Sequence, residues 1–215
     1  MKKYVYLLIF LFGFANISNA VTKKIGVSLL GGVFETSAME KEGTENSASK
    51  SAEGLFAIPS LFVELSPNDK IFVGLDYVPM ALESEETEHN QKDKTTSATA
   101  SSVVNKAQVD FEDLMTLYAR IALNDNVYAK AGIMQVEAVT NEVLGTGSTY
   151  GDETLQGAML AIGYEADLGG TFARLEANWM EIGGETFTST NNSDNKVVVE
   201  DIDGYGIKLS IGKTF

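Results

Sequence analysis

The chain has 215 residues, no cysteine and a formal net charge of −14 at pH 7. It can therefore form no disulfide and no thiolate metal site, and nucleophilic cysteine chemistry is excluded. Its acidity argues against nucleic acid as a partner, because a protein that binds phosphates needs clustered lysine and arginine. The length is enough for one domain, and no internal repeat or second domain is visible.

The N-terminus has the pattern of a secretory signal peptide. Two lysines precede an apolar run over residues 4–14, and a polar stretch then ends at 18–20 with small residues at the cleavage positions. The run is too short for a membrane-spanning helix, which needs roughly 20 apolar residues, so an inner-membrane anchor is the weaker interpretation. We predict a cleaved signal peptide over residues 1–20, which leaves residues 21–215 as the exported domain.

The exported part alternates between short turn signals and long polar stretches. The turn signals consist of residues that tolerate turn geometry and lie at 66–69, 124–126 and 169–170. Long loops are rare in such number in a compact soluble domain, and we expect them at 36–52, 83–107, 141–153 and 188–196. Three turns and four loops imply eight strands. We place the strands at residues 25–35, 54–65, 70–82, 108–123, 127–139, 154–168, 171–187 and 197–215.

Apolar and polar residues alternate within these segments. Leu175 and Trp179 share one face of their strand, while Arg174 and Glu176 share the other. Such alternation describes a strand with one lipid-compatible and one polar face, and each segment has the roughly 9 to 11 residues that cross a membrane. We predict an all-β, eight-stranded antiparallel up-and-down transmembrane barrel with short periplasmic turns and long extracellular loops. A soluble lipocalin-like barrel is a weaker alternative.

The polar faces carry acids and bases in balance. An eight-stranded barrel is just wide enough for its own side chains to fill it, and an uncompensated buried charge is strongly destabilising. We therefore predict a plugged lumen held by ion pairs, with no wide aqueous pore. The predicted lumen network comprises Glu64, Asp76, Arg120, Lys130, Glu165, Arg174, Glu176 and Lys208.

Aromatic residues mark the expected membrane boundaries and the end of the chain. We assign an aromatic girdle to Tyr77, Tyr164, Trp179, Tyr205 and Phe215. The last strand places one apolar face on Tyr205, Ile207, Leu209, Ile211 and Phe215. Lys213 departs from this alternation. An amphipathic strand that ends on an aromatic residue resembles the signal that outer-membrane barrels present to their insertion machinery, and we predict that these residues form such a signal.

The signal peptide, the rhythm of turns and loops, and the final strand resemble the small outer-membrane barrels of Gram-negative bacteria. These include the OmpA transmembrane domain and the OmpX, OmpW and opacity-protein groups, and no subfamily is resolved. The resemblance implies a location in the bacterial outer membrane, with lipid, lipopolysaccharide and the barrel-insertion machinery as partners. It also implies roles in envelope integrity, adhesion, defence evasion or passage of small hydrophobic molecules.

Catalytic signals are scarce. The single histidine, His89, lies in the acidic run 83–89 of the longest loop, where Ser84 or Ser97 could partner it. A catalytic triad needs a base held by a third group on a rigid element, which a loop does not supply. We therefore expect no enzymatic activity and no cofactor.

The same acidic run, with the acids of the first loop and the stretch 191–194, makes calcium or magnesium a candidate partner, because oxygen-rich loops suit hard cations. The spacing matches no defined cation loop, so a solvated acidic surface is the simpler interpretation. We predict a non-enzymatic structural or surface-interaction barrel with acidic outer loops. The alternative is a narrow outer-membrane channel or transporter for small solutes.

Overall fold

A computed structural model of the chain describes residues 21–42, 45–46, 50–83, 87–92, 102–144 and 148–215. These residues form β-strands joined by turns and connections, and the described part of the chain contains no helix. Accordingly, no described helix is long and apolar enough to cross a membrane. The signal peptide expected at residues 1–20 lies outside the described residues and stays a prediction.

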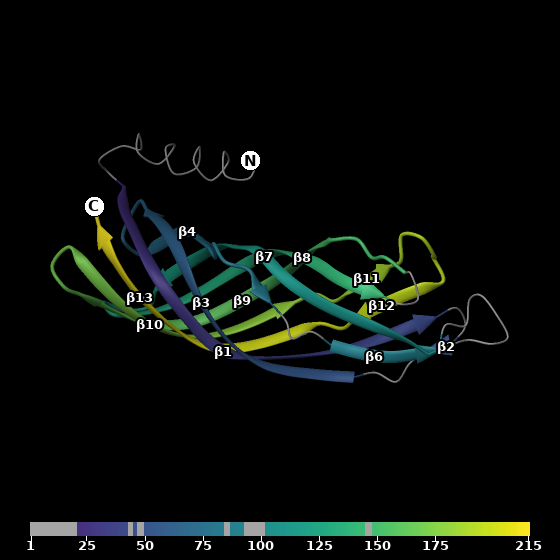
Figure 1. The fold of residues 1–215 in the computed structure, drawn as a ribbon. Helices are drawn as coiled ribbons and strands as arrows, with labels where there is room; N and C mark the ends of the chain where they lie inside the picture. The colour runs from purple at the N-terminus through teal and green to yellow at the C-terminus, as the bar shows by residue number, and fades with distance from the viewer. Residues whose placement is uncertain (1–20, 43–44, 47–49, 84–86, 93–101, 145–147) are drawn as a thin grey trace.

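The described strands form a single antiparallel sheet that is closed on itself (Figure 1). The strand bounds are β1 (Thr22–Glu42), β2 (Glu45–Asn46), β3 (Lys50–Ser66), β4 (Ile71–Tyr77), β5 (Leu82–Glu83), β6 (Thr87–Lys92), β7 (Ser102–Ala122), β8 (Val127–Leu144), β9 (Glu153–Asp167), β10 (Thr171–Ile182), β11 (Glu185–Thr188), β12 (Asn195–Val199) and β13 (Ile202–Thr214).

Closure comes from β1, which pairs with β3 on one side and with β13 on the other. The wall then continues from β3 through β4, β7, β8, β9 and β10 back to β13, so eight strands form the barrel wall. The short segments β5 and β6 both pair with β7. The short strands β11 and β12 pair with each other in the connection between β10 and β13, and β12 also pairs with β1. The predicted fold class is therefore confirmed as an all-β, closed eight-stranded antiparallel barrel.

Short turns join β3 to β4, β7 to β8 and β9 to β10 at the end of the barrel that also holds the C-terminus (Figure 1). Asn68 and Asn124 each accept two backbone N–H bonds through the side-chain oxygen, which closes the first two turns locally. In the third turn Gly169 and Gly170 have φ of 78° and 88°, a conformation that disfavours a side chain. All three predicted turns are confirmed.

The long loops are shorter than predicted. β1 continues to Glu42 and pairs there with β12, and β6 pairs with the lower-numbered end of β7 inside the segment expected to be irregular. The prediction used polarity to mark the end of each strand. Beyond the bilayer both faces of a strand can meet water, so polar side chains no longer indicate where backbone pairing stops.

Three predicted strands are interrupted. The third ends at Tyr77, directly before Val78 and Pro79, because proline has no N–H for a ladder. The seventh is divided at Gly183 and Gly184, because glycine weakens a strand interior. The eighth is divided at 200–201, between β12 and β13.

The alternation of side chains separates a lipid-compatible exterior from a filled interior. Along β10, Thr171 and Leu175 face outward while Phe172 and Glu176 are buried. Leu175 is 51 % exposed, as expected for a residue whose outer surface contacts lipid rather than protein. Large exposed apolar residues recur on the outward faces of β1, β4, β7, β9 and β13, so the apolar surface surrounds the barrel.

Leu175→Arg should destabilise the barrel by about 2 to 4 kcal/mol, because it brings a charge to the apolar belt near mid-height. Thr171→Arg is the matched control, since it lies on the same face of β10 next to the short turn and should cost roughly 0 to 1 kcal/mol. Urea titrations of protein refolded in lipid vesicles measure both values. Equal costs at the two positions would show that the outward face or its depth is assigned wrongly.

Candidate functional site

The half of the lumen nearest the short turns contains a group of charged side chains that we call the lower cluster. Its members come from five different barrel strands. They are Lys24 on β1, Glu64 on β3, Arg120 on β7, Glu165 on β9 and Arg174 on β10. Each lies on the inward face of its strand by alternation. Glu64 is 1 % exposed and Arg120 is 3 % exposed, so the cluster is removed from bulk water.

Glu64 is the centre of the lower cluster. Arg174 reaches it from across the lumen with two N–H bonds, Nη1 to Oε1 at 2.9 Å and Nη2 to Oε2 at 2.6 Å. Arg120 donates from Nη2 to Oε2 at 3.3 Å, and the Tyr118 hydroxyl donates to Oε1 at 2.9 Å. Bidentate arginine pairs are among the stronger charge-assisted hydrogen bonds, so the buried carboxylate is fully compensated.

Glu165 is the second acid of the lower cluster. Its Oε2 accepts from Arg174 Nε at 2.6 Å and lies 3.4 Å from Arg120 Nη1, and its Oε1 binds Lys24. Two carboxylates and three bases therefore form one continuous network. The network joins strands that are not neighbours in the wall.

Aromatic rings stack on the bases of this network. The guanidinium carbon of Arg120 lies 4.1 Å from the Phe72 ring centroid and 4.6 Å from that of Tyr128. The same carbon of Arg174 lies 4.4 Å from the Phe172 ring centroid. Such cation–π contacts are stronger where the cation is removed from water, and here they also exclude water from the ion pairs.

Glycines make room for these rings on the opposite strand. Gly163 pairs with Tyr128, and a Cβ at position 163 would lie 2.4 Å from the tyrosine ring. The same arrangement joins Gly74 to Tyr118, again at 2.4 Å. Because a rigid ring cannot yield to a Cβ at that distance, the interior has no spare space here.

A second layer of ion pairs lies above the lower cluster. Lys130 Nζ is 2.6 Å from Glu176 Oε1, and Lys208 binds Asp76. Together the two layers contain all eight residues of the predicted lumen network, every one inside the barrel. They also contain Lys24, which the prediction missed because it started the first strand at Ile25.

An apolar layer follows above the second ion pairs. It consists of Leu30, Ile58, Val78, Met134, Met159 and Met180, all buried. Between this layer and the ion pairs lies a cavity of about 30 Å³, lined in part by Asp76, Lys130 and Asn178. That volume is about the share of one water molecule in the liquid. The lumen is therefore closed by side chains at successive heights.

The barrel wall has a gap in its backbone ladder between β3 and the chain that follows β4, and we call this gap the seam. β3 pairs with β4 only from Leu61↔Tyr77 to Leu65↔Val73. Beyond this stretch β3 keeps only its pairing with β1, and the chain after Tyr77 keeps only its contact with β7, where Val78 N–H donates to Leu114 O at 2.9 Å. Two of the three prolines of the chain, Pro59 and Pro79, lie at this seam, as expected of residues that avoid the interior of a ladder.

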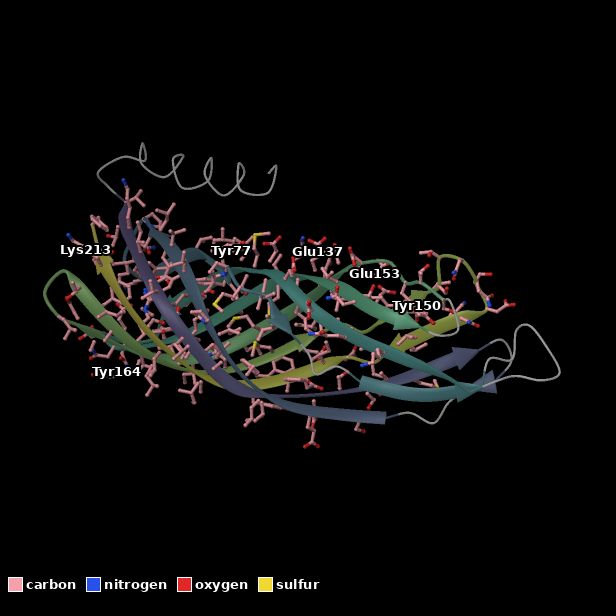
Figure 2. The ribbon with its side chains drawn as sticks, in the orientation of Figure 1. Tyr77, Glu137, Tyr150, Glu153, Tyr164 and Lys213 are labelled. Carbon is pink, nitrogen blue, oxygen red and sulfur yellow. The ribbon has the colours of Figure 1, made fainter. Side chains whose placement is uncertain are left out.

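The residues predicted as girdle and insertion signal lie on the outer surface. Trp179 pairs directly with Tyr205 across β10 and β13, which forms an aromatic pair at one height. Tyr164 and Lys213 lie toward the short-turn end, whereas Tyr150, Glu137 and Glu153 lie toward the opposite end (Figure 2). Tyr77 is half-buried and its hydroxyl donates to Asp113 Oδ1 at 2.8 Å.

The residues of the predicted insertion signal are all more than half exposed, at 53 to 63 %. They are Tyr205, Ile207, Leu209, Ile211 and Phe215.

The predicted loop sites lie largely outside the described residues. The side chains of Glu40, Glu42, Glu45 and His89 and the serines at 84 and 97 are not described. Within the described part of the chain, no three His, Cys, Asp or Glu side chains gather in a way that could hold a metal ion. The interior is therefore the candidate site that the structure brings together.

Comparison with known proteins finds similarity to solved structures alone, each at low sequence identity. No protein-family model matches it. No curated protein matches it either. Among solved structures, it resembles the outer membrane protein OprG from Pseudomonas aeruginosa at 14 % identity and a TM-score of 0.46, with 89 % of this chain and 97 % of OprG covered.

Two other solved structures are similar to a comparable extent. The outer membrane protease OmpT from Escherichia coli has 9 % identity and a TM-score of 0.47, covering 91 % of this chain and 96 % of OmpT. Neisserial surface protein A has 12 % identity and a TM-score of 0.36, covering 87 % of this chain and 97 % of that protein. The chain itself is a small eight-stranded antiparallel β-barrel. The likeness identifies no particular relative, since these TM-scores are below 0.5.

Removing Arg174 tests the lower cluster. Arg174→Ala should destabilise the barrel by about 3 to 5 kcal/mol, because it leaves Glu64 as a buried carboxylate without its bidentate partner. Adding Glu64→Gln to Arg174→Ala removes the negative charge of the buried carboxylate and should recover part of the lost free energy of unfolding. Urea unfolding of the single and double variants in the same lipid measures the coupling, and strictly additive losses would contradict a shared network.

Proposed function

We propose that the protein is a non-enzymatic structural and surface-interaction barrel of the bacterial outer membrane, with a lumen plugged by its own side chains. The observation that carries the proposal is the filling of the lumen by two layers of ion pairs and an apolar layer. A solute would have to displace these buried ion pairs and the rings that stack on them. The barrel is therefore better suited to hold its loops at the cell surface than to conduct.

The proposal takes the interior acids to be structural rather than catalytic. Glu64 and Glu165 each contact two arginines, and Asp76 and Glu176 each bind a lysine. A general acid or base must exchange its proton with a substrate, and carboxylates held in this way on both sides of a packed lumen have no substrate within reach. The ion pairs thus supply cohesion to a small barrel.

The proposed partners follow from the exterior. The exposed apolar belt suits outer-membrane lipid, and the outer ends of the strands suit contact with lipopolysaccharide or other cells. We propose that divalent cations bridge the acidic loops to that surface, because the chain carries a net charge of −14 and lipid phosphates are also anionic. We also propose the outward face of β13 as the signal for the insertion machinery.

A second candidate function is passage of small apolar solutes, and the seam favours it. Ile58 and Val78, both 4 % exposed, belong to the apolar layer, and each lies next to a proline of the seam. An unpaired stretch of wall beside apolar side chains offers a solute a lateral route that avoids the ion pairs. Such a route would carry apolar molecules and no ionic current.

Conductance separates a plugged barrel from an aqueous channel. Planar-bilayer recordings of the wild type should show negligible current, and Arg120→Ala should lower stability in urea without producing a steady current, since the Phe72 and Tyr128 rings still fill that height. Lys213→Ala, an exposed lysine outside the network, is the matched control and should change neither property. A steady, ion-selective current from the wild type would overturn the plugged lumen.

Vesicles that contain the barrel test the second candidate. If the lateral route operates, an apolar fluorescent solute should enter loaded vesicles faster than it enters protein-free ones, and Ile58→Lys should abolish the difference by placing a charge beside the seam. Uptake rates equal to those of empty vesicles would leave the surface-interaction role as the function supported.

The insertion signal is tested at the last residue. The backbone of Phe215 exchanges two hydrogen bonds with Lys23, at 2.8 and 3.1 Å, and alanine or tyrosine at this position keeps the same backbone groups. Phe215→Ala should therefore lower the amount of heat-modifiable barrel in the outer-membrane fraction through loss of the ring alone, while Phe215→Tyr should preserve it. Equal amounts of Phe215→Ala and wild-type barrel in that fraction would contradict the proposal.

A further inference from the structure

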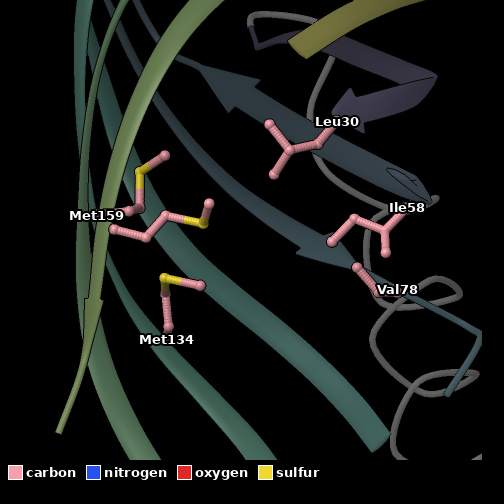
Figure 3. Packing of buried hydrophobic residues seen from close by; sticks show 6 residues of the cluster. Leu30, Ile58, Val78, Met134 and Met159 are labelled. Atoms are coloured by element: carbon pink, nitrogen blue, oxygen red, sulfur yellow. The ribbon is translucent and has the colours of Figure 1, made fainter. Parts of the chain in front are cut away.

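Three methionines lie side by side on one wall of the apolar layer. They come from three neighbouring strands of the wall and are Met134 on β8, Met159 on β9 and Met180 on β10. Their side chains are buried, with exposed fractions of 5, 7 and 9 %. Figure 3 shows Met134 and Met159 on one wall, facing Leu30, Ile58 and Val78 on the other. We call these three residues the methionine trio.

The register of the sheet sets their spacing. Met159 pairs directly with Met180, and Met134 pairs with Gly157, two residues from Met159. Directly opposite residues have Cβ atoms about 4.5 to 5.5 Å apart and diagonal ones somewhat farther, still within reach of long side chains. Three flexible thioethers can therefore converge on one point above the ion pairs.

Space for a ligand lies at that point. All three methionines line the cavity of about 30 Å³ below the apolar layer. Asn178 also lines it, is 6 % exposed, and its side-chain nitrogen has no hydrogen-bond partner among the described residues. A buried amide nitrogen without a partner, in a residue that lines an unfilled space, indicates a bound water or another small occupant.

Thioether sulfur is a soft ligand that selects soft metal ions, above all Cu(I). The chain has no cysteine, so methionine is its only buried soft ligand. We propose that the methionine trio binds one soft monovalent metal ion, Cu(I) or its close chemical analogue Ag(I), and that a water held by Asn178 completes its coordination.

Charge favours a monovalent ion. The thioethers are neutral, and the nearest charged groups, Lys130 with Glu176 and Lys208 with Asp76, are already paired. A divalent ion would bring two uncompensated charges into a buried site, whereas a soft monovalent ion brings one and gains three polarisable ligands. The trio therefore discriminates against Zn²⁺, Ca²⁺ and Mg²⁺, whose preferred ligands are absent from it.

Silver binding tests the trio with a redox-inert probe. The full barrel is refolded in detergent with Ag(I) in chloride-free nitrate buffer, so that uptake does not depend on opening of the folded lumen, and bound silver is measured after removal of free ion. We expect one Ag(I) per barrel and a rise in melting temperature. In methyl spectra of labelled methionine, the Met134, Met159 and Met180 signals should shift while the exposed Met80 signal stays in place.

Met159→Leu is the decisive variant, because leucine and methionine are close in volume and exchange at little cost in packing. It should fold as the wild type does and lose the bound silver, whereas the matched control Met80→Leu should keep it. Absence of stoichiometric silver from the wild type, or silver retained by folded Met159→Leu, would overturn the proposal. Retention of Zn²⁺ in the same assay, with equal occupancy, would overturn the selectivity assigned to the trio.

Discussion

The buried carboxylate of Glu64 constrains the structure around it. A charge in a low-dielectric interior is strongly destabilising unless it is paired and hydrogen-bonded, and Glu64 is compensated only when Arg174, Arg120 and Tyr118 reach it at the same time. These groups come from β7 and β10, which are not neighbours of β3 in the wall. The interaction therefore acts across the lumen and not along the sheet.

Strand register depends on this interaction. A slip of one residue in β3 would turn Glu64 toward lipid and bring a neighbouring apolar residue into the lumen, because side chains alternate with period two. The same slip would separate a ring of β3 from the glycine that accommodates it, because Phe62 lies opposite Gly26 of β1. Charge compensation and ring packing therefore select one register, which backbone hydrogen bonds alone do not distinguish.

The interior changes character with height. Ion pairs and stacked rings fill the part nearest the short turns, and an apolar layer with three methionines lies above them. The gap in the ladder between β3 and the chain after Tyr77 lies at the height of this apolar layer, beside Ile58 and Val78. The lower part thus has the most strongly constrained packing, while the part nearer the loops combines flexible side chains with an incomplete wall.

Much of the fold could be read from local sequence. Alternation in β10 distinguishes Leu175 from Arg174 and Glu176 without any tertiary information, because the pleat sends successive side chains to opposite faces. The three short turns were also recognisable, since Asn68, Asn124 and the pair 169–170 have local backbone roles. The same alternation extended by one residue would have found Lys24, which lies two residues before the inward-facing Gly26.

Other features had no local signal. Met134, Met159 and Met180 are apolar residues on inward faces, and polarity alone assigns apolar residues to the lipid. The extension of β1 to Glu42 and the end of β3–β4 pairing at Leu61 depend on which strand lies alongside at that height. The sequence by itself determined which residues alternate, where the chain turns, and that buried charges must be paired. Only the closed barrel decided which acid meets which base, because those contacts cross the lumen between strands up to 141 positions apart in sequence.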